Sequence, residues 1–325
     1  MKQADMSEAV ALDGQMTDDH GSCEQLTTGV WRLKILFVNV YLVAADNGRW
    51  VLIDAGLKGA GQKIADTAAQ LFGEDNPPAA IILTHGHFDH VGALHYLLGI
   101  WDVPIYAHAM EIPYLTGQAE YPPPDPFAGG GMMSWISFLY PNKPANLGDR
   151  VTPLDKDGSL PFLHKWRYLL TPGHAPGHIS LFRDTDKVLI AGDAFVTTRQ
   201  ESAFSILFQK RHLSGPPKYF TYDWETAAES VKMLQELNPS VAASGHGKPM
   251  RGRELTEGLL NLVKNFDRIA VPQNGRYTRK PARVNRRGVV ELPSARPMLN
   301  KTLVTSIVAI AVVGGLAWLQ MKKMK

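Results

Sequence analysis

The fold of this chain is limited first of all by a run of metal-ligand side chains that directly follows a predicted buried strand. Residues 79–83 are apolar and predict the strand, and residues 84–90 then read THGHFDH. Three imidazoles and a carboxylate within six residues are costly to keep beside a core unless an ion neutralises and orients them. Imidazole and carboxylate suit Zn²⁺, and Gly86 lets the backbone turn tightly enough to aim its neighbours inward. The run therefore predicts a metal site at a strand end.

Ligand-type residues also follow three other predicted strands. His174, Asp193 and His246 come shortly after the strand-like runs at 166–170, 188–190 and 241–243, respectively. Because strand ends in a layered fold converge on one rim, these side chains can meet the first cluster there. The combined set holds five histidines and two aspartates: His85, His87, His90, His174, His246, Asp89 and Asp193. Seven ligands are too many for one tetrahedral zinc and suit two metals that share one carboxylate.

The pattern around these motifs predicts two packed sheets. Apolar, β-branched and aromatic runs in 29–56 flank a turn at 46–48, which is typical of a β-hairpin, and a helical stretch follows near 60–72. A second series of strand-like runs leads to a predicted helix over 224–237. Two β-rich stretches, each followed by helix, indicate sheets packed face to face with helices outside.

Residues 111–148 interrupt this rhythm with runs of proline and glycine around several aromatic side chains. A long irregular segment inside a compact domain is often a functional lid. Trp135 and Phe138 are therefore candidate substrate contacts. The alternative is that these aromatic residues pack the loop onto the body or onto a membrane.

The C-terminal region predicts a membrane anchor. Leu303 to Leu319 contains no charged residue and is bracketed by lysines. A helix over these residues is roughly 26 Å long, slightly short of a bilayer core of about 30 Å. The N-terminus is acidic and has no apolar run, so we expect no signal peptide. The arginines before the span agree with the positive-inside rule and favour a single-pass anchor with the catalytic domain in the cytoplasm. A buried core helix is the alternative.

Charge is distributed unevenly along the chain. The formal net charge is +3, but residues 276–325 hold 11 Lys and Arg against one acid, Glu291, which leaves the body mildly acidic. A nucleic-acid-binding domain would carry its positive charge on a folded face, so we expect no nucleic-acid partner. With one cysteine, Cys23, a cysteine-based metal cluster is excluded within the chain.

The order HxHxDH, GH, GD and GHG resembles the metallo-β-lactamase superfamily over residues 28–265. The resemblance implies an α/β fold of the αββα type, with the metals in a groove at one edge of the two sheets. It also implies three roles for the ligands: His85, His87 and His174 bind the first metal, Asp89, His90 and His246 bind the second, and Asp193 bridges them. Asp89 and Asp193 are then the catalytic residues. Asp54, in LIDAG, is a candidate partner for a ligand histidine, with a turn-stabilising role as the alternative.

The complete expectation is an αββα metallo-β-lactamase sandwich plus a C-terminal transmembrane helix. Its parts are an N-terminal extension at 1–27, a hydrolase domain at 28–270 with the lid-like insertion at 111–148, a basic juxtamembrane linker at 271–301 and the transmembrane helix at 302–320. The expected cofactors are two Zn²⁺ per chain, with iron or manganese as alternatives.

Within the superfamily, TPGHAPGHISLF followed by LIAGDA is most similar to the quorum-quenching lactonases, which open acyl-homoserine lactones. Their lactone-contacting tyrosine is replaced here by Val196, so Tyr222 or a lid aromatic would take its place. The expected substrate is a small ester, lactone or thioester, attacked by a hydroxide that two zincs share. The alternatives are a thioesterase similar to glyoxalase II, a lipid phosphodiesterase, and a non-catalytic membrane adaptor.

Overall fold

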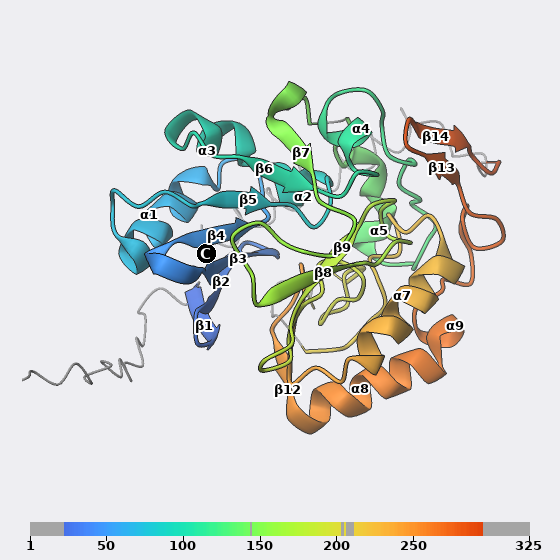
Figure 1. The fold of residues 1–325 in the computed structure, drawn as a ribbon. Helices are drawn as coiled ribbons and strands as arrows, with labels where there is room; N and C mark the ends of the chain where they lie inside the picture. Colours follow the sequence, from blue (N-terminus) through green and yellow to red (C-terminus); the bar gives the residue numbers. More distant parts are fainter. Residues whose placement is uncertain (1–22, 144, 203–204, 206–210, 295–325) are drawn as a thin grey trace, which may run out of the picture. The chain divides into compact units, whose positions relative to one another are not determined.

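The computed structural model describes residues 23–143, 145–202, 205 and 211–294. Residues 23–292 lie in one compact unit of the chain. Two sheets form the centre of this unit, and helices cover their outer faces (Figure 1).

The first sheet has seven strands, and its spatial order follows the sequence. They are β1 (Cys23–Thr27), β2 (Val30–Ile35), β3 (Val38–Ala44), β4 (Trp50–Ile53), β5 (Ala80–Ile82), β6 (Ile105–Ala107) and β7 (Val151–Pro153). The strands β1 to β4 are antiparallel, and β4 to β7 pair in parallel. The parallel strands need crossover connections, and helices α1 (Gly61–Phe72) and α3 (Leu94–Ile100) lie in two of them.

The second sheet has five strands in the order β12-β11-β10-β9-β8. Their bounds are β8 (Trp166–Leu170), β9 (Ile179–Arg183), β10 (Val188–Ile190), β11 (Val241–Ala243) and β12 (Met250–Arg251). The parallel pair β10 and β11 is connected through α7 (Trp224–Glu236), and α8 (Gly252–Lys264) follows β12. Asp223 caps α7, because its side chain accepts a hydrogen bond from the Thr226 N–H.

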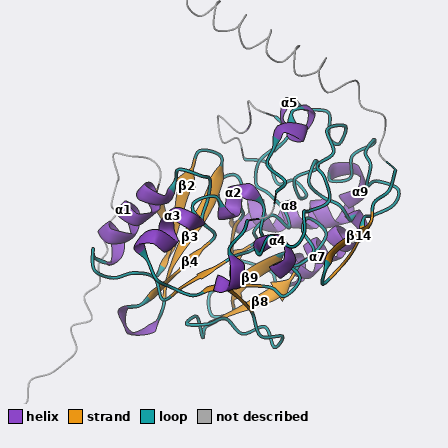
Figure 2. Cartoon of the chain, turned by 90° about the horizontal axis from the view of Figure 1, so that it is seen from above, coloured by secondary structure: helices purple, strands orange, loops and turns teal. Residues whose placement is uncertain are grey.

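Side chains that point alternately to the two faces of each strand produce a fold of four layers, with two sheets between two layers of helices. In β10, Leu189 packs with α7 and α8, whereas its neighbours Val188 and Ile190 face the first sheet. In β4, Leu52 packs with α1 and α3, and Val51 faces the second sheet. Because successive side chains on a strand point to opposite faces, each sheet contributes to the central core and to one outer core. The result is an αββα sandwich, and Figure 2 shows the strands between α1 and α3 on one side and α7 and α8 on the other.

Shorter elements complete the described chain. The helices are α2 (Phe88–Val91), α4 (Ile112–Leu115), α5 (Met132–Trp135) and α9 (Phe266–Ile269), with 3₁₀ turns at Asp46–Gly48, Ser137–Leu139 and Gly148–Arg150. The segment 111–148 therefore contains short helical turns between irregular stretches. Residues that we assigned to a linker form a hairpin of β13 (Arg283–Asn285) and β14 (Gly288–Glu291).

The region 29–56 is a three-stranded meander, where we expected a single hairpin. The predicted turn at 46–48 connects β3 to β4, and a second turn at Leu36 and Phe37 connects β2 to β3. Leu36 adopts a φ of 56° and is exposed. Neither residue is a typical turn former, so the second turn carries no sequence signal.

The predicted C-terminal transmembrane helix was wrong. Across the described residues, the structure contains no helix with the length and apolar character that crossing a membrane requires, and the predicted span at 302–320 lies outside those residues. The helices α7 and α8 have 13 residues each and are polar on one face, whereas a bilayer core needs about 20 predominantly apolar residues. The localisation in a membrane, with the catalytic domain in the cytoplasm, depended on that helix and is withdrawn with it.

Candidate metal centre

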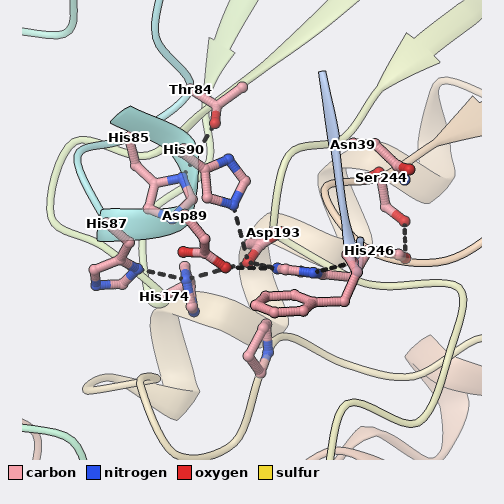
Figure 3. A network of polar contacts seen from close by, with 12 residues as sticks. Asn39, Thr84, His85, His87, Asp89, His90, His174, Asp193, Ser244 and His246 are labelled. Carbon is pink, nitrogen blue, oxygen red and sulfur yellow. Dashed lines mark hydrogen bonds and ion pairs between the residues drawn. The ribbon is translucent and has the colours of Figure 1, made fainter. Parts of the chain in front are cut away.

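The seven predicted ligand residues converge at one edge of the two sheets. His85 and His87 lie in the turn after β5, and Asp89 and His90 lie on α2, which begins directly after that turn. The remaining three come from the second sheet: His174 from the loop between β8 and β9, Asp193 from the turn after β10, and His246 from the turn after β11. Figure 3 shows these side chains pointing toward one another.

Asp193 occupies the middle of the cluster. Its Oδ2 atom lies 3.1 Å from His246 Nε2, 3.5 Å from His174 Nε2 and 3.7 Å from His90 Nε2. His87 Nδ1 lies 2.9 Å from His174 Nε2, and Asp89 Oδ2 lies 3.5 Å from His246 Nε2.

Three triplets of side chains in this cluster have ligand atoms within 4.8 Å of one another. They are His85, His87 and His174; His85, His90 and Asp193; and Asp89, His90 and His246. All seven residues are buried. The first and third triplets contain the same residues as the two ligand sets that the resemblance implies, and the second contains Asp193, for which it implies a bridging role.

The hydrogen bonds around the imidazoles fix which nitrogen carries the proton. Thr84 Oγ1 donates to Asp54 Oδ2, so the same hydroxyl accepts from His85 Nδ1–H at 3.1 Å. Thr221 Oγ1 donates to Pro217 O, so it accepts from His174 Nδ1–H at 3.5 Å. In both rings Nε2 is therefore left with its lone pair toward the centre of the cluster.

In His246 and His90, too, a hydrogen bond from Nδ1 turns Nε2 toward the centre of the cluster. His246 Nδ1–H donates to the carbonyl oxygen of Phe37 at 2.9 Å, and His90 Nδ1–H donates to Asp54 Oδ2 at 2.8 Å. A ligating imidazole needs its second nitrogen held in this way, because that bond fixes the ring and its tautomer.

Several buried atoms of the cluster have no hydrogen-bond partner among the described residues. They are His85 Nε2, His90 Nε2 and Asp193 Oδ1. Burying polar atoms unpaired costs about 1–3 kcal/mol each. A cation at this place would satisfy all of them together, so the residues present fit divalent metal ions.

Burial and charge divide the histidines into two groups. Burial lowers the pKa of His87 to about 3 and lowers the pKa values of His85 and His174 well below the ordinary value. Burial acts on His90 and His246 in the same direction, but nearby carboxylates outweigh it and raise both pKa values. The three neutral imidazoles are thus ready to ligate a cation at neutral pH.

The pKa values of the two aspartates are shifted in opposite directions. Burial would raise the pKa of Asp193, but His246 and His90 hold it well below the ordinary range. The pKa of Asp89 is raised, mainly by burial. Asp193 is therefore the carboxylate that stays ionised at the centre of the cluster.

The position directly before His246 requires a glycine, Gly245, because of its close neighbours. A Cβ atom at this position would lie 2.1 Å from Asp193 Oδ1 and 2.8 Å from His90 Cε1. Any side chain here would fill the space between the ligands, so the GHG motif keeps that space open.

Aromatic side chains enclose His87. Phe220 stacks on its ring at a centroid distance of 4.6 Å, and Tyr121 lies against it at 4.5 Å. Tyr140 contacts both Phe220 and Phe88. These aromatic residues form a wall beside the cluster, which we call the aromatic wall: Phe88, Tyr121, Tyr140 and Phe220.

The sequence pointed to other aromatic residues. Trp135 is exposed, Phe138 is half-buried, and Tyr222 is buried with Tyr277 and Ala282 below the β13–β14 hairpin. The Tyr222 backbone N–H donates to Gly173 O beside His174, but its side chain packs away from the ligands. Within the described part of the chain, neither Trp135 nor Phe138 makes a hydrogen bond or ring contact with the seven ligand residues. Phe88 begins α2, and the other three residues of the aromatic wall come from loops without periodicity, so no sequence pattern could have selected the wall as a whole.

Glu111 also escaped the sequence analysis. It is fully buried, and its carboxylate accepts the backbone N–H groups of Gly86 and Gly177 at 2.9 and 2.6 Å. Burial raises its pKa to about 7. Its two backbone partners belong to separate ligand-bearing loops, which only the folded chain brings together.

Known proteins are similar to this chain in sequence and in fold. Residues 33–246 match the family model of the metallo-beta-lactamase superfamily. A probable metallo-hydrolase of Bacillus subtilis, YflN, is 45% identical over 251 residues, which cover 77% of this chain and 95% of that protein. A second probable metallo-hydrolase of B. subtilis, YqgX, is 34% identical over 64% of this chain and 84% of that protein.

One solved structure illustrates the shared fold. The metallo-beta-lactamase family protein TTHA1429 from Thermus thermophilus superposes with a TM-score of 0.53 at 22% identity, over 75% of this chain and 81% of that one.

Proposed function

The chain belongs to the metallo-beta-lactamase superfamily, and from this premise we propose that it is a hydrolase whose site holds two zinc ions. It is a metal-dependent hydrolase that acts on a small molecule. His85, His87 and His174 would hold the first ion, and Asp89, His90 and His246 the second. Asp193 would contact both, and iron or manganese could replace zinc.

One observation carries the two-ion proposal. Four imidazoles engage Nδ1 in hydrogen bonds directed away from the cluster, which turns four Nε2 atoms into it. A structural histidine cluster would pair all of these nitrogens, but His85 Nε2 and His90 Nε2 have no hydrogen-bond partner among the described residues. Together with two aspartates and His87, four inward-facing Nε2 atoms are more than one tetrahedral ion can use.

The chemistry depends on charge and on exclusion of water. Bound zinc ions lower the pKa of water toward neutrality and polarise a carbonyl or phosphoryl oxygen. Asp193 supplies the fixed negative charge at the centre, and Asp54 holds His90 in the tautomer that leaves Nε2 free. The aromatic wall covers His87 and offers an apolar surface to the acyl part of a substrate.

We propose a small ester or lactone as the substrate. The support is the similarity of TPGHAPGHISLF and LIAGDA to the lactonases, together with the apolar surface next to the ligands. Tyr222 is turned toward the β13–β14 hairpin, so Tyr140, which is half-buried beside Phe220, is the better candidate for a lactone contact.

A second candidate is a thioester with an anionic leaving group. A cavity of about 610 Å³ is lined by three basic residues, Arg199, Lys218 and Arg268, by Glu201, which pairs with Lys218 at 3.7 Å, and by a glycine-rich loop at 129–131. Lys218 precedes Phe220 by two residues, which places their Cα atoms within about 7 Å. A substrate bound beside Phe220 could therefore reach the basic cavity with its leaving group.

The test is hydrolysis by the full chain, supplied with zinc, iron or manganese. The panel is an acyl-homoserine lactone, an S-acyl glutathione and an aryl phosphodiester. Turnover of the lactone that Asp193→Asn abolishes would support the main proposal, and turnover of the thioester alone would support the second candidate. Failure to hydrolyse any ester or thioester while carrying two ions would contradict both.

A further inference from the structure

Glu111 connects the two loops that carry the proposed ligands of the first ion. Its Oε2 accepts the N–H of Gly86, which stands between His85 and His87. Its Oε1 accepts the N–H of Gly177, in the loop that carries His174. One side chain thus joins a loop of the first sheet to a loop of the second.

Tyr121 completes this arrangement. Its hydroxyl donates to Glu111 Oε2 and accepts the Gly86 N–H at 2.9 Å. Its ring packs between Tyr114, at 4.1 Å and nearly parallel, and His87, at 4.5 Å. The phenol therefore transmits the position of the carboxylate to the face of the His87 imidazole.

The space around Gly86 and Gly177 leaves no room for a larger residue at either position. A Cβ at Gly86 would lie 2.7 Å from the Tyr121 hydroxyl oxygen, and a Cβ at Gly177 would lie 2.9 Å from Glu111 Cγ. The two glycines let the backbone approach closely enough for both N–H groups to reach one carboxylate. Burying a carboxylate without a cation is costly, so a hydrophobic contact would be the cheaper way to join two loops.

We propose that Glu111 is a positioning residue that sets the separation of His87 and His174, and that the first ion depends on it while the second does not. The inference rests on the proposed two-ion site. Two of the second ion's proposed ligands, His90 and His246, are held by other contacts, from Asp54 and from the Phe37 carbonyl, respectively.

Glu111→Gln tests this assignment with almost no change in shape. The amide keeps one acceptor oxygen, but its NH₂ group must face a backbone N–H of Gly86 or Gly177, so one loop loses its anchor. Loss of a partner that orients ligands typically weakens metal affinity about 10–100-fold. The matched control is Asp125→Asn, because Asp125 is also buried and accepts two backbone N–H groups, from Phe127 and Arg276, away from the ligand loops.

The measurement is calorimetric titration of the metal-free full chain with Zn²⁺ in two single-site backgrounds. His246→Ala removes a ligand of the second ion, and His87→Ala removes a ligand of the first. Glu111→Gln should weaken Zn²⁺ binding about 10–100-fold in the His246→Ala background and leave it unchanged in the His87→Ala background. Asp125→Asn should change neither.

Equal losses in both backgrounds, or none in either, would overturn the inference while leaving the two-ion proposal intact. Failure of the unsubstituted chain to bind Zn²⁺ would instead contradict the proposed function. Should Glu111→Gln not fold, Tyr121→Phe serves in its place, because it keeps the carboxylate and removes one donor. It should weaken only the first site, and no such loss would also overturn the inference.

Discussion

At position 54, both the backbone conformation and the hydrogen bonds of the side chain favour an aspartate. It follows β4 with a φ of 62°, in the left-handed region, and its own N–H donates to the carbonyl of Ile82. This turn directs both carboxylate oxygens at Thr84 and His90, at 2.7 to 2.8 Å. Among non-glycine residues, Asp and Asn tolerate this conformation best, so the position restricts its side chain twice.

Asp54→Asn should therefore weaken metal binding without unfolding the chain. The amide oxygen can still accept the Thr84 N–H, but the NH₂ group would face His90 Nδ1–H. His90 would then move its proton to Nε2, the nitrogen that must be free to bind an ion. We expect about 10–100-fold weaker binding of the second ion, measured by equilibrium dialysis against Zn²⁺.

Asp223→Asn is the control for that prediction, because Asn is an equally good cap for α7 and Asp223 accepts the Thr226 N–H there. Metal affinity that is unchanged in Asp54→Asn would contradict the role given to Asp54.

At this scale, the sequence identified residues whose chemistry is local and missed those whose role depends on distant contacts. Each of the seven ligand-type residues stands in a short motif after a strand, and the structure gathers all seven. Glu111 contacts Gly177, 66 residues away, and Phe220 contacts His87 from another loop. No spacing rule connects such pairs, so a single sequence holds no signal for them.

The junction between β4 and α2 depends on close contact between backbones. Gly92 donates its N–H to the carbonyl of Gly56 at 2.7 Å, and a Cβ here would lie 2.3 Å from the Lys58 nitrogen and 2.6 Å from the Leu57 carbonyl carbon. Its φ of −60° is ordinary, so the restriction is purely steric. This contact holds α2, which carries Asp89 and His90, against the first sheet.

Gly92→Ala should destabilise the fold by about 1–3 kcal/mol, because the added methyl group overpacks a junction made of backbone. Gly99→Ala provides the matched control, since Gly99 lies inside α3 and a Cβ there meets nothing within 4 Å. Replacing Gly by Ala in a helix interior should stabilise the protein by about 0.5–1 kcal/mol. Urea denaturation of both variants measures the difference, and equal stabilities would contradict this account of the junction.

Strands and helices were predictable where periodicity is strong. The predicted helix at 224–237 corresponds to α7, and the apolar run at 79–83 contains β5. The turn at Leu36 and Phe37 was not predictable, because it contains no Gly, Asn or Pro.

At the scale of the whole molecule, the metal cluster joins the two halves of the sandwich. Four of its side chains come from the first sheet's segment at 84–90, and three come from strand ends of the second sheet. Ions bound there would add attraction across the central core. Two β-rich stretches in the sequence were enough to predict the layers, but the register between the sheets is set by packing of the central core.

Removal of metal should therefore lower the stability of the whole fold. An ion that binds only the folded chain stabilises it by about 4 kcal/mol at a free concentration of 1,000 Kd. For a domain of this size about 1 kcal/mol corresponds to 2–4 °C, so one such ion raises Tm by about 10 °C. Differential scanning calorimetry with and without chelator measures the effect, and Asp193→Asn should show a smaller shift. An identical Tm in both conditions would mean that ions do not connect the two halves.

The central claim is a site for two ions organised around Asp193, and counting metals per chain tests it most directly. We would purify the full chain and its Asp193→Asn variant, supply both with zinc, remove unbound metal, and measure the ions by inductively coupled plasma mass spectrometry. The account predicts two ions per chain in the unsubstituted protein and about one or fewer in the variant. Fewer than one ion per chain in the folded unsubstituted protein, or two in both proteins, would contradict it.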